Sequence, residues 1–319
     1  MRAALYRSPG GSDVLSVEDV DTPEPGPGEV RVRVRVAGVN PTDWKRRSTT
    51  APDGAFQVPG QDGAGDIDAV GDGVEPGRIG ERVWVWFAAR PGRQWGSAGQ
   101  YTVVPSRQAV RLPDAVSYDD GAGLGVPAMT AWHCLYADGP IEGRPILIAG
   151  GAGAVGNAAV ALARRDGATV ITTVSGPEKA VLAESAGAHA VVNYRDSDAA
   201  EQIRRHAPDG VHRIVEVALG ANVELDLAVL APRGVISTYA DDSLADLPVR
   251  RLMVANVTLH FVLIYGISDV SLDAAAAGVA AAAADLPRLP VTRFPLAEAA
   301  AAHDAVQQGA LGKVLIDIP

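Results

Sequence analysis

Three closely spaced glycines form the part of this 319-residue sequence that is best suited to binding a ligand. Gly151, Gly153 and Gly156 follow the pattern G-x-G-x-x-G, directly after an apolar run at residues 146–148. Apolar residues at helical spacing continue from Val155. This order of strand, turn and helix is typical of dinucleotide binding, because glycines let backbone N–H groups approach a pyrophosphate at the positive end of the helix. A glycine turn in another kind of α/β protein is the alternative interpretation.

The end of the next strand predicts which dinucleotide would bind. Enzymes that use NAD usually place Asp or Glu about 20 residues after the glycine turn, where the carboxylate binds the ribose 2′-hydroxyl. Here the strand at residues 168–174 ends in two threonines and a valine, followed by Ser175 and, further on, Lys179. A hydroxyl and an ammonium would hold a 2′-phosphate that a carboxylate would repel. The sequence therefore favours NADP(H), although Lys179 could also be an ordinary solvated helix lysine.

Three regions that differ in composition and in their predicted secondary structure must position these residues. Residues 1–118 are rich in Gly, Pro and Val and contain short strands separated by turns, which is an all-β pattern. Residues 119–256 alternate helices and strands, which predicts a parallel sheet built from βαβ units. Residues 257–319 are predicted to contain an apolar strand at 257–266, an alanine-rich helix at 274–284, a helix at 296–308 and a final strand at 313–318.

Valine and arginine alternate strictly at residues 30–36, which indicates a half-buried strand with its valines inward. Arg31, Arg33 and Arg35 could form an anion site. Their period of two favours a solvated strand face instead.

Composition excludes several classes of function. The net charge of −10 argues against nucleic acid as the main partner, because no basic cluster offsets it. The single cysteine, Cys134, excludes an intramolecular disulfide and a thiolate zinc cluster. No apolar run is long enough to span a bilayer, and the N-terminal residues lack a signal-peptide core. We therefore expect a cytoplasmic protein that does not associate with membranes.

The whole chain resembles the medium-chain dehydrogenase/reductase superfamily, and within it the zinc-independent quinone oxidoreductases of the zeta-crystallin type. The segments that carry this resemblance are AGVNPTDWKRR (37–47), PGQDGAGDIDAVGDGV (59–74), GERVW (80–84), GVPAMTAW (125–132), AGGAGAVG (149–156), AGAHAVVNYRD (186–196) and GKVLIDI (312–318).

The resemblance implies an α/β fold, in which a Rossmann domain with a doubly wound parallel sheet is inserted into a GroES-like β domain. The implied boundaries are 1–118 for the GroES-like catalytic domain and 119–256 for the NADP(H)-binding domain. Residues 257–319 would supply the last Rossmann strand and the return to the catalytic domain. Zinc-dependent relatives carry a GHE motif where this chain has Gly60-Gln61-Asp62, with Gln61 in place of the histidine, and a cysteine where it has Asn40, so no metal site is expected.

The resemblance also assigns site residues. Asn40 and Lys45 would face the substrate as the catalytic residues, although relatives often have a tyrosine where this chain has Lys45. The positions implied to contact the cofactor are Thr130, Gly150, Gly151, Ala152, Gly153, Ala154, Val155, Gly156, Ser175, Lys179, Tyr194, Tyr239, Ala240, Val262 and Leu263.

The implied activity is hydride transfer from NADPH to a quinone or an enone, with no zinc. An enoyl reductase acting on an acyl or polyketide-like thioester is the first alternative. The second, from another class, is a non-catalytic NADPH-binding protein. Relatives of this type form homodimers or tetramers, and the apolar segment at residues 257–264 would suit a homodimer interface.

Overall fold

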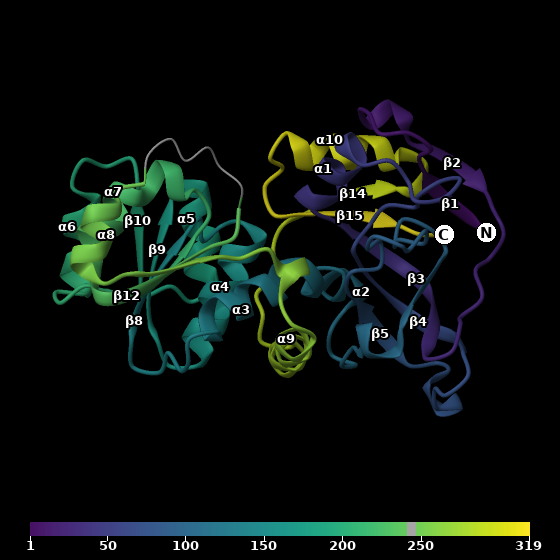
Figure 1. Ribbon diagram of the computed structural model, residues 1–319, viewed down its shortest axis with the longest axis horizontal. Helices are drawn as coiled ribbons and strands as arrows, with labels where there is room; N and C mark the ends of the chain where they lie inside the picture. Colours follow the sequence, from purple (N-terminus) through teal and green to yellow (C-terminus); the bar gives the residue numbers. More distant parts are fainter. Residues whose placement is uncertain (241–246) are drawn as a thin grey trace. The chain divides into compact units, whose positions relative to one another are not determined.

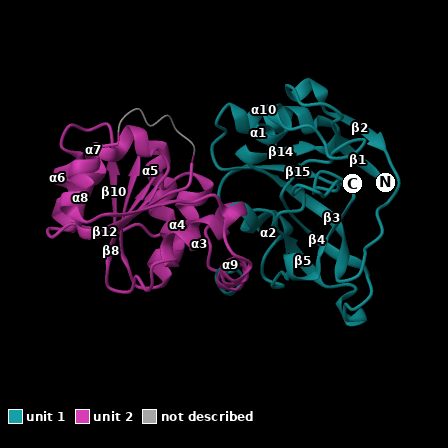
Figure 2. Cartoon of the chain, in the orientation of Figure 1, with its two compact units in different colours: residues 1–126, 279–284, 288–319 teal, residues 127–278, 285–287 magenta. Residues whose placement is uncertain are grey.

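The computed structural model describes residues 1–240 and 247–319, which form two compact units (Figure 2). Unit 1 contains Met1–Val126, Val279–Ala284 and Arg288–Pro319. Unit 2 contains Pro127–Gly278 and Asp285–Pro287. Unit 2 is therefore inserted into the sequence of unit 1. The division at residues 118 and 256 stays a prediction.

Unit 2 is built on a six-stranded sheet whose paired strands are all parallel (Figure 1). Its strands are β8 (Pro145–Ala149), β9 (Thr169–Val174), β10 (Ala190–Asn193), β11 (Val211–Glu216), β12 (Leu230–Thr238) and β13 (Thr258–Phe261). The spatial order β10-β9-β8-β11-β12-β13 is that of a doubly wound dinucleotide-binding sheet, with the order reversing between β8 and β11. The predicted fold class is confirmed.

Helices connect these strands, as right-handed parallel crossovers require. The connecting helices are α4 (Ala154–Arg165), α5 (Pro177–Ser185), α6 (Ala199–His206), α7 (Leu219–Val229) and α8 (Val249–Ala255). In addition, α3 (Met129–Tyr136) precedes β8, and α9 (Asp269–Ala282) follows β13. Among the described residues, no helix combines the length and apolar character needed to cross a bilayer. The cytoplasmic location stays a prediction.

Two predicted elements differ from the structure by five residues at one end. The strand expected at residues 257–266 ends at Phe261, because its partner β12 ends at Thr238, which lies opposite Phe261. The alanine-rich helix starts five residues earlier than expected, at Asp269. A carboxylate in the first turn stabilises the helix N-terminus.

Unit 1 contains a mostly antiparallel sheet in the order β14-β15-β3-β4-β5-β7, with β6 also paired to β3. These strands are β3 (Glu29–Val39), β4 (Asp62–Val70), β5 (Arg82–Val85), β6 (Tyr101–Pro105), β7 (Ala109–Arg111), β14 (Val291–Pro295) and β15 (Lys313–Asp317). The two-stranded sheet of β1 (Arg2–Leu5) and β2 (Ser16–Asp19) and the helices α1 (Pro41–Thr49), α2 (Tyr118–Gly121) and α10 (Ala299–Gln307) complete the unit. Because β15 pairs with β3, the C-terminal segment belongs to the same sheet as the N-terminal strands.

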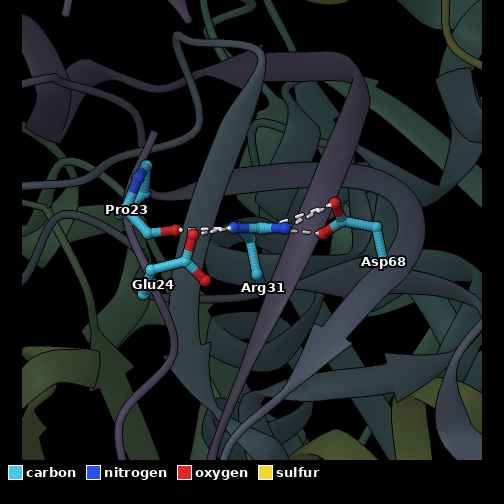
Figure 3. Close-up of polar contacts among 4 residues, drawn as sticks. All are labelled: Pro23, Glu24, Arg31 and Asp68. Carbon is cyan, nitrogen blue, oxygen red and sulfur yellow. Dashed lines mark hydrogen bonds and ion pairs between the residues drawn. The ribbon is translucent and has the colours of Figure 1, made fainter. Parts of the chain in front are cut away.

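The arginines of β3 make ion pairs on a face of this sheet. Arg31 donates to both carboxylate oxygens of Asp68, to Glu24 and to the carbonyl oxygen of Pro23 (Figure 3). Arg35 lies 2.8 Å from Asp66, and both Arg33 and Arg35 are exposed. Arg31 and Arg35 are thus neutralised by carboxylates of the same unit, which fits a strand face rather than an anion site.

Candidate active site

The predicted glycine turn lies at the carboxyl end of β8, directly beside the point where the strand order reverses. In doubly wound sheets this is where ligands bind. The N–H groups of Gly150 and Gly151 both donate to the carbonyl oxygen of Thr173, at 3.0 and 3.1 Å. Asn157 anchors the turn from the other side, because its side-chain amide donates to the carbonyl oxygen of Gly151 at 3.1 Å. The turn is therefore held in one conformation by β9 and α4.

Steric contacts explain why the turn needs glycine. A Cβ atom on Gly151 would lie 2.2 Å from Thr172 Oγ1, and one on Gly156 would lie 2.3 Å from the carbonyl oxygen of Gly150. Gly150 has a φ of +71°, which disfavours side chains. Gly153 is different, since a Cβ there would have ordinary space and the residue is exposed. Gly153 therefore leaves open the outer side of the turn, where a ligand would approach.

The helix that follows the turn presents its first N–H groups. α4 begins at Ala154 after the N-cap Gly153, and among the described residues no side chain caps it. Uncapped N–H groups at a helix N-terminus favour a bound anion. Turn and helix together fit the pyrophosphate of a dinucleotide.

The residues expected around the adenosine end lie at the carboxyl ends of β9 and β10. Ser175 follows β9, Tyr194 follows β10, and Lys179 is exposed on α5. Sequence reasoning missed Arg195, whose guanidinium donates to the carbonyl oxygen of Ser175 at 3.3 Å and lies 5.7 Å from the Tyr194 ring. Its position directly after the expected Tyr194, at the end of a parallel strand, is the signal that could have found it.

The remaining expected cofactor residues lie in other parts of unit 2. Tyr239 and Ala240 follow β12, and the N–H of Tyr239 donates to the carbonyl oxygen of Glu216 at 3.1 Å. Val262 and Leu263 follow β13, and the N–H of Val262 donates to Thr238 at 2.7 Å. These four residues thus share the carboxyl edge of the sheet with the glycine turn. Thr130 is buried in α3.

Unit 2 also contains a buried carboxyl pair that sequence reasoning missed. Glu216 ends β11, and its Oε1 accepts hydrogen bonds from the N–H groups of Val217 and Ala218 and from the Asn222 side chain. Asp226 on α7 hydrogen-bonds to Glu216, and burial together with the Glu216 charge raises the pKa of Asp226 well above its usual value. The hydrogen bonds to Glu216 Oε1 fix the backbone directly after β11.

In unit 1, Asn40 lies in a cluster of buried polar groups. It is the N-cap of α1, and its backbone N–H donates to Asp43 Oδ2 at 2.7 Å. Its Nδ2 donates to Asp62 Oδ2 at 2.7 Å, and its Oδ1 accepts from Lys313 Nζ at 2.9 Å. Lys45 is exposed on the same helix. Of the two expected catalytic residues, only Asn40 belongs to this cluster.

Burial dominates the electrostatics of the cluster. It raises the pKa of Asp62 and lowers that of Lys313, while the attraction between the two charges opposes both changes. The backbone N–H of Val126 donates to both oxygens of Asp62, at 2.9 and 3.0 Å, and also favours the carboxylate. Burial raises the pKa of Asp43 to about 7. Sequence reasoning did not connect Asp62 and Lys313 with Asn40, because only the folded chain brings the three side chains together.

This cluster does not fit a zinc ion. A catalytic zinc takes about three ligands from Cys, His or carboxylate. Asn40 and Gln61 offer amides instead, and the Asp62 carboxylate already accepts hydrogen bonds from Asn40 and Val126. Gln61 Nε2 donates to the carbonyl oxygen of Ala89 at 3.0 Å. The Lys313 ammonium lies 3.9 Å from Asp62 and would repel a dication. Across residues 1–240 and 247–319, no group of three or more His, Cys, Asp or Glu side chains is arranged to hold a metal ion.

Two family models match the chain and define its class. The "Alcohol dehydrogenase GroES-like domain" matches residues 26–114, in unit 1. The "Zinc-binding dehydrogenase" model matches residues 154–277, which include α4 and the strands β9 to β13 of the parallel sheet. A GroES-like domain joined to a domain of this kind defines a medium-chain dehydrogenase/reductase.

Similar proteins narrow this class. Human quinone oxidoreductase is 27% identical over 325 residues, covering 99% of this chain and 97% of that protein, and mouse quinone oxidoreductase is 30% identical over 73% and 71%. A mycobacterial protein solved in complex with NADPH is 27% identical with a TM-score of 0.83, and a 2-haloacrylate reductase is 30% identical with a TM-score of 0.83. Each of these two structures covers 99% of both chains. The chain belongs to the quinone oxidoreductase family.

The buried Asp43 predicts how stability depends on pH. Its pKa is 3.8 in a model peptide and about 7 in the fold. The unfolded chain therefore loses the proton first, and the free energy of unfolding falls as pH rises from about 4 to 7. Asp43→Asn keeps an acceptor for the Asn40 N–H but does not titrate. Relative to wild type, this variant should gain more than about 1 kcal/mol between pH 5 and pH 8, since one pKa unit is about 1.4 kcal/mol.

Denaturant unfolding measures this, with fluorescence from Trp84 and Trp86, which are buried in the same unit. Asp114→Asn is the control, because that side chain is 92% exposed. Parallel pH profiles for wild type and Asp43→Asn would contradict the prediction.

Proposed function

We propose that this chain transfers a hydride from NADPH to a quinone or a related conjugated carbonyl compound, without zinc. The observation that carries the proposal is the rigid glycine turn at the switch point of a doubly wound sheet, in a chain similar along its whole length to quinone oxidoreductases. NADPH, when bound, supplies the hydride.

Three features of unit 2 support NADPH as the cofactor. The end of β9 carries no carboxylate, since Thr173, Val174 and Ser175 stand where NAD enzymes place Asp or Glu. Two cations lie near Ser175: Lys179 follows it closely in the sequence, and Arg195 donates to its carbonyl oxygen. Cations at this position suit a 2′-phosphate. A similar mycobacterial protein was solved with NADPH.

The groups around Asn40 support a reaction without zinc. The amides and the ammonium in this cluster are hydrogen-bond donors and not metal ligands. The chain also has a single cysteine, which is buried in unit 2.

Negative charge develops on the acceptor oxygen during hydride transfer, and hydrogen-bond donors stabilise it. Each such donor is worth roughly 3 kcal/mol. We assign this role to Asn40 and Lys45. Asn40 Nδ2 carries a second hydrogen beyond the one donated to Asp62, and Lys45 carries an exposed ammonium. A hydroquinone anion or an enolate collects its proton from water, so no protein acid is required.

Reduction of a carbon–carbon double bond conjugated to a carboxyl or thioester group is the second candidate. The 30% identity to a 2-haloacrylate reductase favours it. This reaction needs a proton delivered to the α-carbon. Binding of NADPH without catalysis is the remaining alternative.

We also propose a homodimer formed through the edge of the parallel sheet at β13. This strand ends the sheet order, and Phe261 and Leu263 are 70% and 68% exposed there. Sedimentation velocity should give twice the chain mass of 32.9 kDa, and Phe261→Lys should shift the protein towards monomer. A wild-type protein that sediments as a monomer would contradict the proposal.

Acceptor-dependent oxidation of NADPH tests the proposed activity. Purified protein is assayed with a panel of quinones, enones, acrylates and enoyl thioesters, with and without a chelator. We expect quinones to be reduced and the chelator to have no effect. Turnover confined to acrylates or thioesters would establish the second candidate, and tight NADPH binding with no turnover would establish a binding protein.

The preference for NADPH should depend on Lys179. Lys179→Glu places a carboxylate near the expected 2′-phosphate, so the ratio of kcat/KM for NADPH to that for NADH should fall at least about tenfold, or about 1.4 kcal/mol. Arg205→Glu makes the same charge change on α6 and should leave the ratio unchanged. If Lys179→Glu keeps the wild-type ratio, Arg195→Ala shows whether Arg195 holds the phosphate instead.

A further inference from the structure

We propose that Lys313 and Asp62 are positioning residues that hold the Asn40 side-chain amide in one orientation, with one Nδ2 hydrogen directed to the acceptor. This inference rests on the proposed function and deepens it. Its first support is geometric, because the two residues contact opposite ends of one amide group. Lys313 Nζ donates to Oδ1 at 2.9 Å, and Asp62 Oδ2 accepts from Nδ2 at 2.7 Å.

The charges of Lys313 and Asp62 favour only one of the two orientations of the Asn40 amide. If the amide turned over, its N–H groups would face the ammonium and its oxygen would face the carboxylate. Both hydrogen bonds would then become repulsive contacts. Because each bond involves one ion, each is stronger than a neutral hydrogen bond. Asn40 alone could rotate, whereas Asn40 between these two ions cannot.

Burial strengthens the effect. The side chains of Asp62 and Lys313 are 0% and 8% exposed, and Asn40 is 3% exposed. Water therefore does not screen the charges well, and the interactions act at a low effective dielectric constant. Ions buried this deeply are costly unless each is fully bonded. The amide of Asn40 is a bonding partner for both ions.

The surrounding backbone fixes the two ions in turn. The N–H of Val126 donates to both oxygens of Asp62. A Cβ on Gly125 would lie 2.1 Å from Asp62 Oδ1, and a Cβ on Gly38 would lie 3.1 Å from Lys313 Cε. Two glycines thus leave room for the ions to reach Asn40. Lys313 is one of three lysines in a chain with 28 basic residues, and a compact ammonium suits this narrow space.

A donor held in place before the reaction needs no reorganisation when charge develops on the acceptor. Loss of the hold should therefore lower kcat and leave NADPH binding unchanged, because the glycine turn belongs to the other unit. Removal of one such donor costs about 10²- to 10³-fold in kcat. Asn40→Ala removes the donor altogether, so its kcat should be the lowest among these variants.

The test compares two variants whose stability and activity should separate. Lys313→Met leaves Asp62 buried without its counter-ion and should unfold at lower denaturant than wild type. Asp62→Asn/Lys313→Met removes both charges and should recover much of that stability. Its kcat should nevertheless remain at least about tenfold below wild type, with the NADPH dissociation constant within twofold. Arg35→Met/Asp66→Asn removes another ion pair between β3 and β4 and is the matched control.

The result that would overturn the proposal is a double variant that regains both stability and wild-type kcat, since the pair would then be structural only. A second measurement does not depend on turnover. In [15N]asparagine-labelled protein, the Asn40 side-chain amide hydrogens should exchange slowly in wild type and faster in the double variant. Equal, fast exchange in both would also overturn it. If wild type reduces nothing in the acceptor panel, the proposed function fails, and amide exchange alone decides whether Lys313 and Asp62 hold Asn40.

Discussion

The contact between the Lys313 ammonium, the Asn40 amide and the Asp62 carboxylate joins parts of unit 1 that are far apart in the sequence. It links the start of β15, the N-cap of α1, the start of β4 and the backbone of Val126. Buried ions of opposite sign tolerate little displacement, because each lost hydrogen bond leaves a charge without solvent. The glycine at position 125 leaves room for the Asp62 carboxylate, and the pairing of β15 with β3 brings the start of β15 to this contact.

The candidate cofactor site of unit 2 depends on backbone groups rather than on buried ions. Its glycine turn has no charged side chain and offers backbone N–H groups and space. Specificity for the phosphate would come from cations at its margin, such as Lys179 and Arg195. The chain thus combines a unit in which side-chain charges are buried and fixed with a unit in which the backbone itself forms the site.

Sequence reasoning succeeded where the physical requirement is local. The glycine turn can be read from neighbouring residues because Gly151 and Gly156 must admit close contacts within β8, β9 and α4. The parallel sheet follows from apolar runs that alternate with helical patterns. Lys313 and Asp62 could not be found in this way, because each acts through contacts with Asn40 far away in the sequence. Arg195 directly follows the expected Tyr194 and could have been found from that position, whereas Asp226 meets Glu216 only when α7 packs beside β11.

The pairing of β15 with β3 also sets an order of events during synthesis. Lys313 joins the growing chain 273 residues after Asn40, and most of the intervening residues form unit 2. At roughly 5–20 residues per second, the 251 residues from Asp62 to Lys313 take about 13–50 s to add, and Asp62 has no counter-ion during this time. Unit 2 is nearly continuous in the sequence and can fold during this interval. The strands of unit 1 that precede unit 2 cannot complete their sheet until translation has passed β15, so they reach their final structure only after unit 2 has been made.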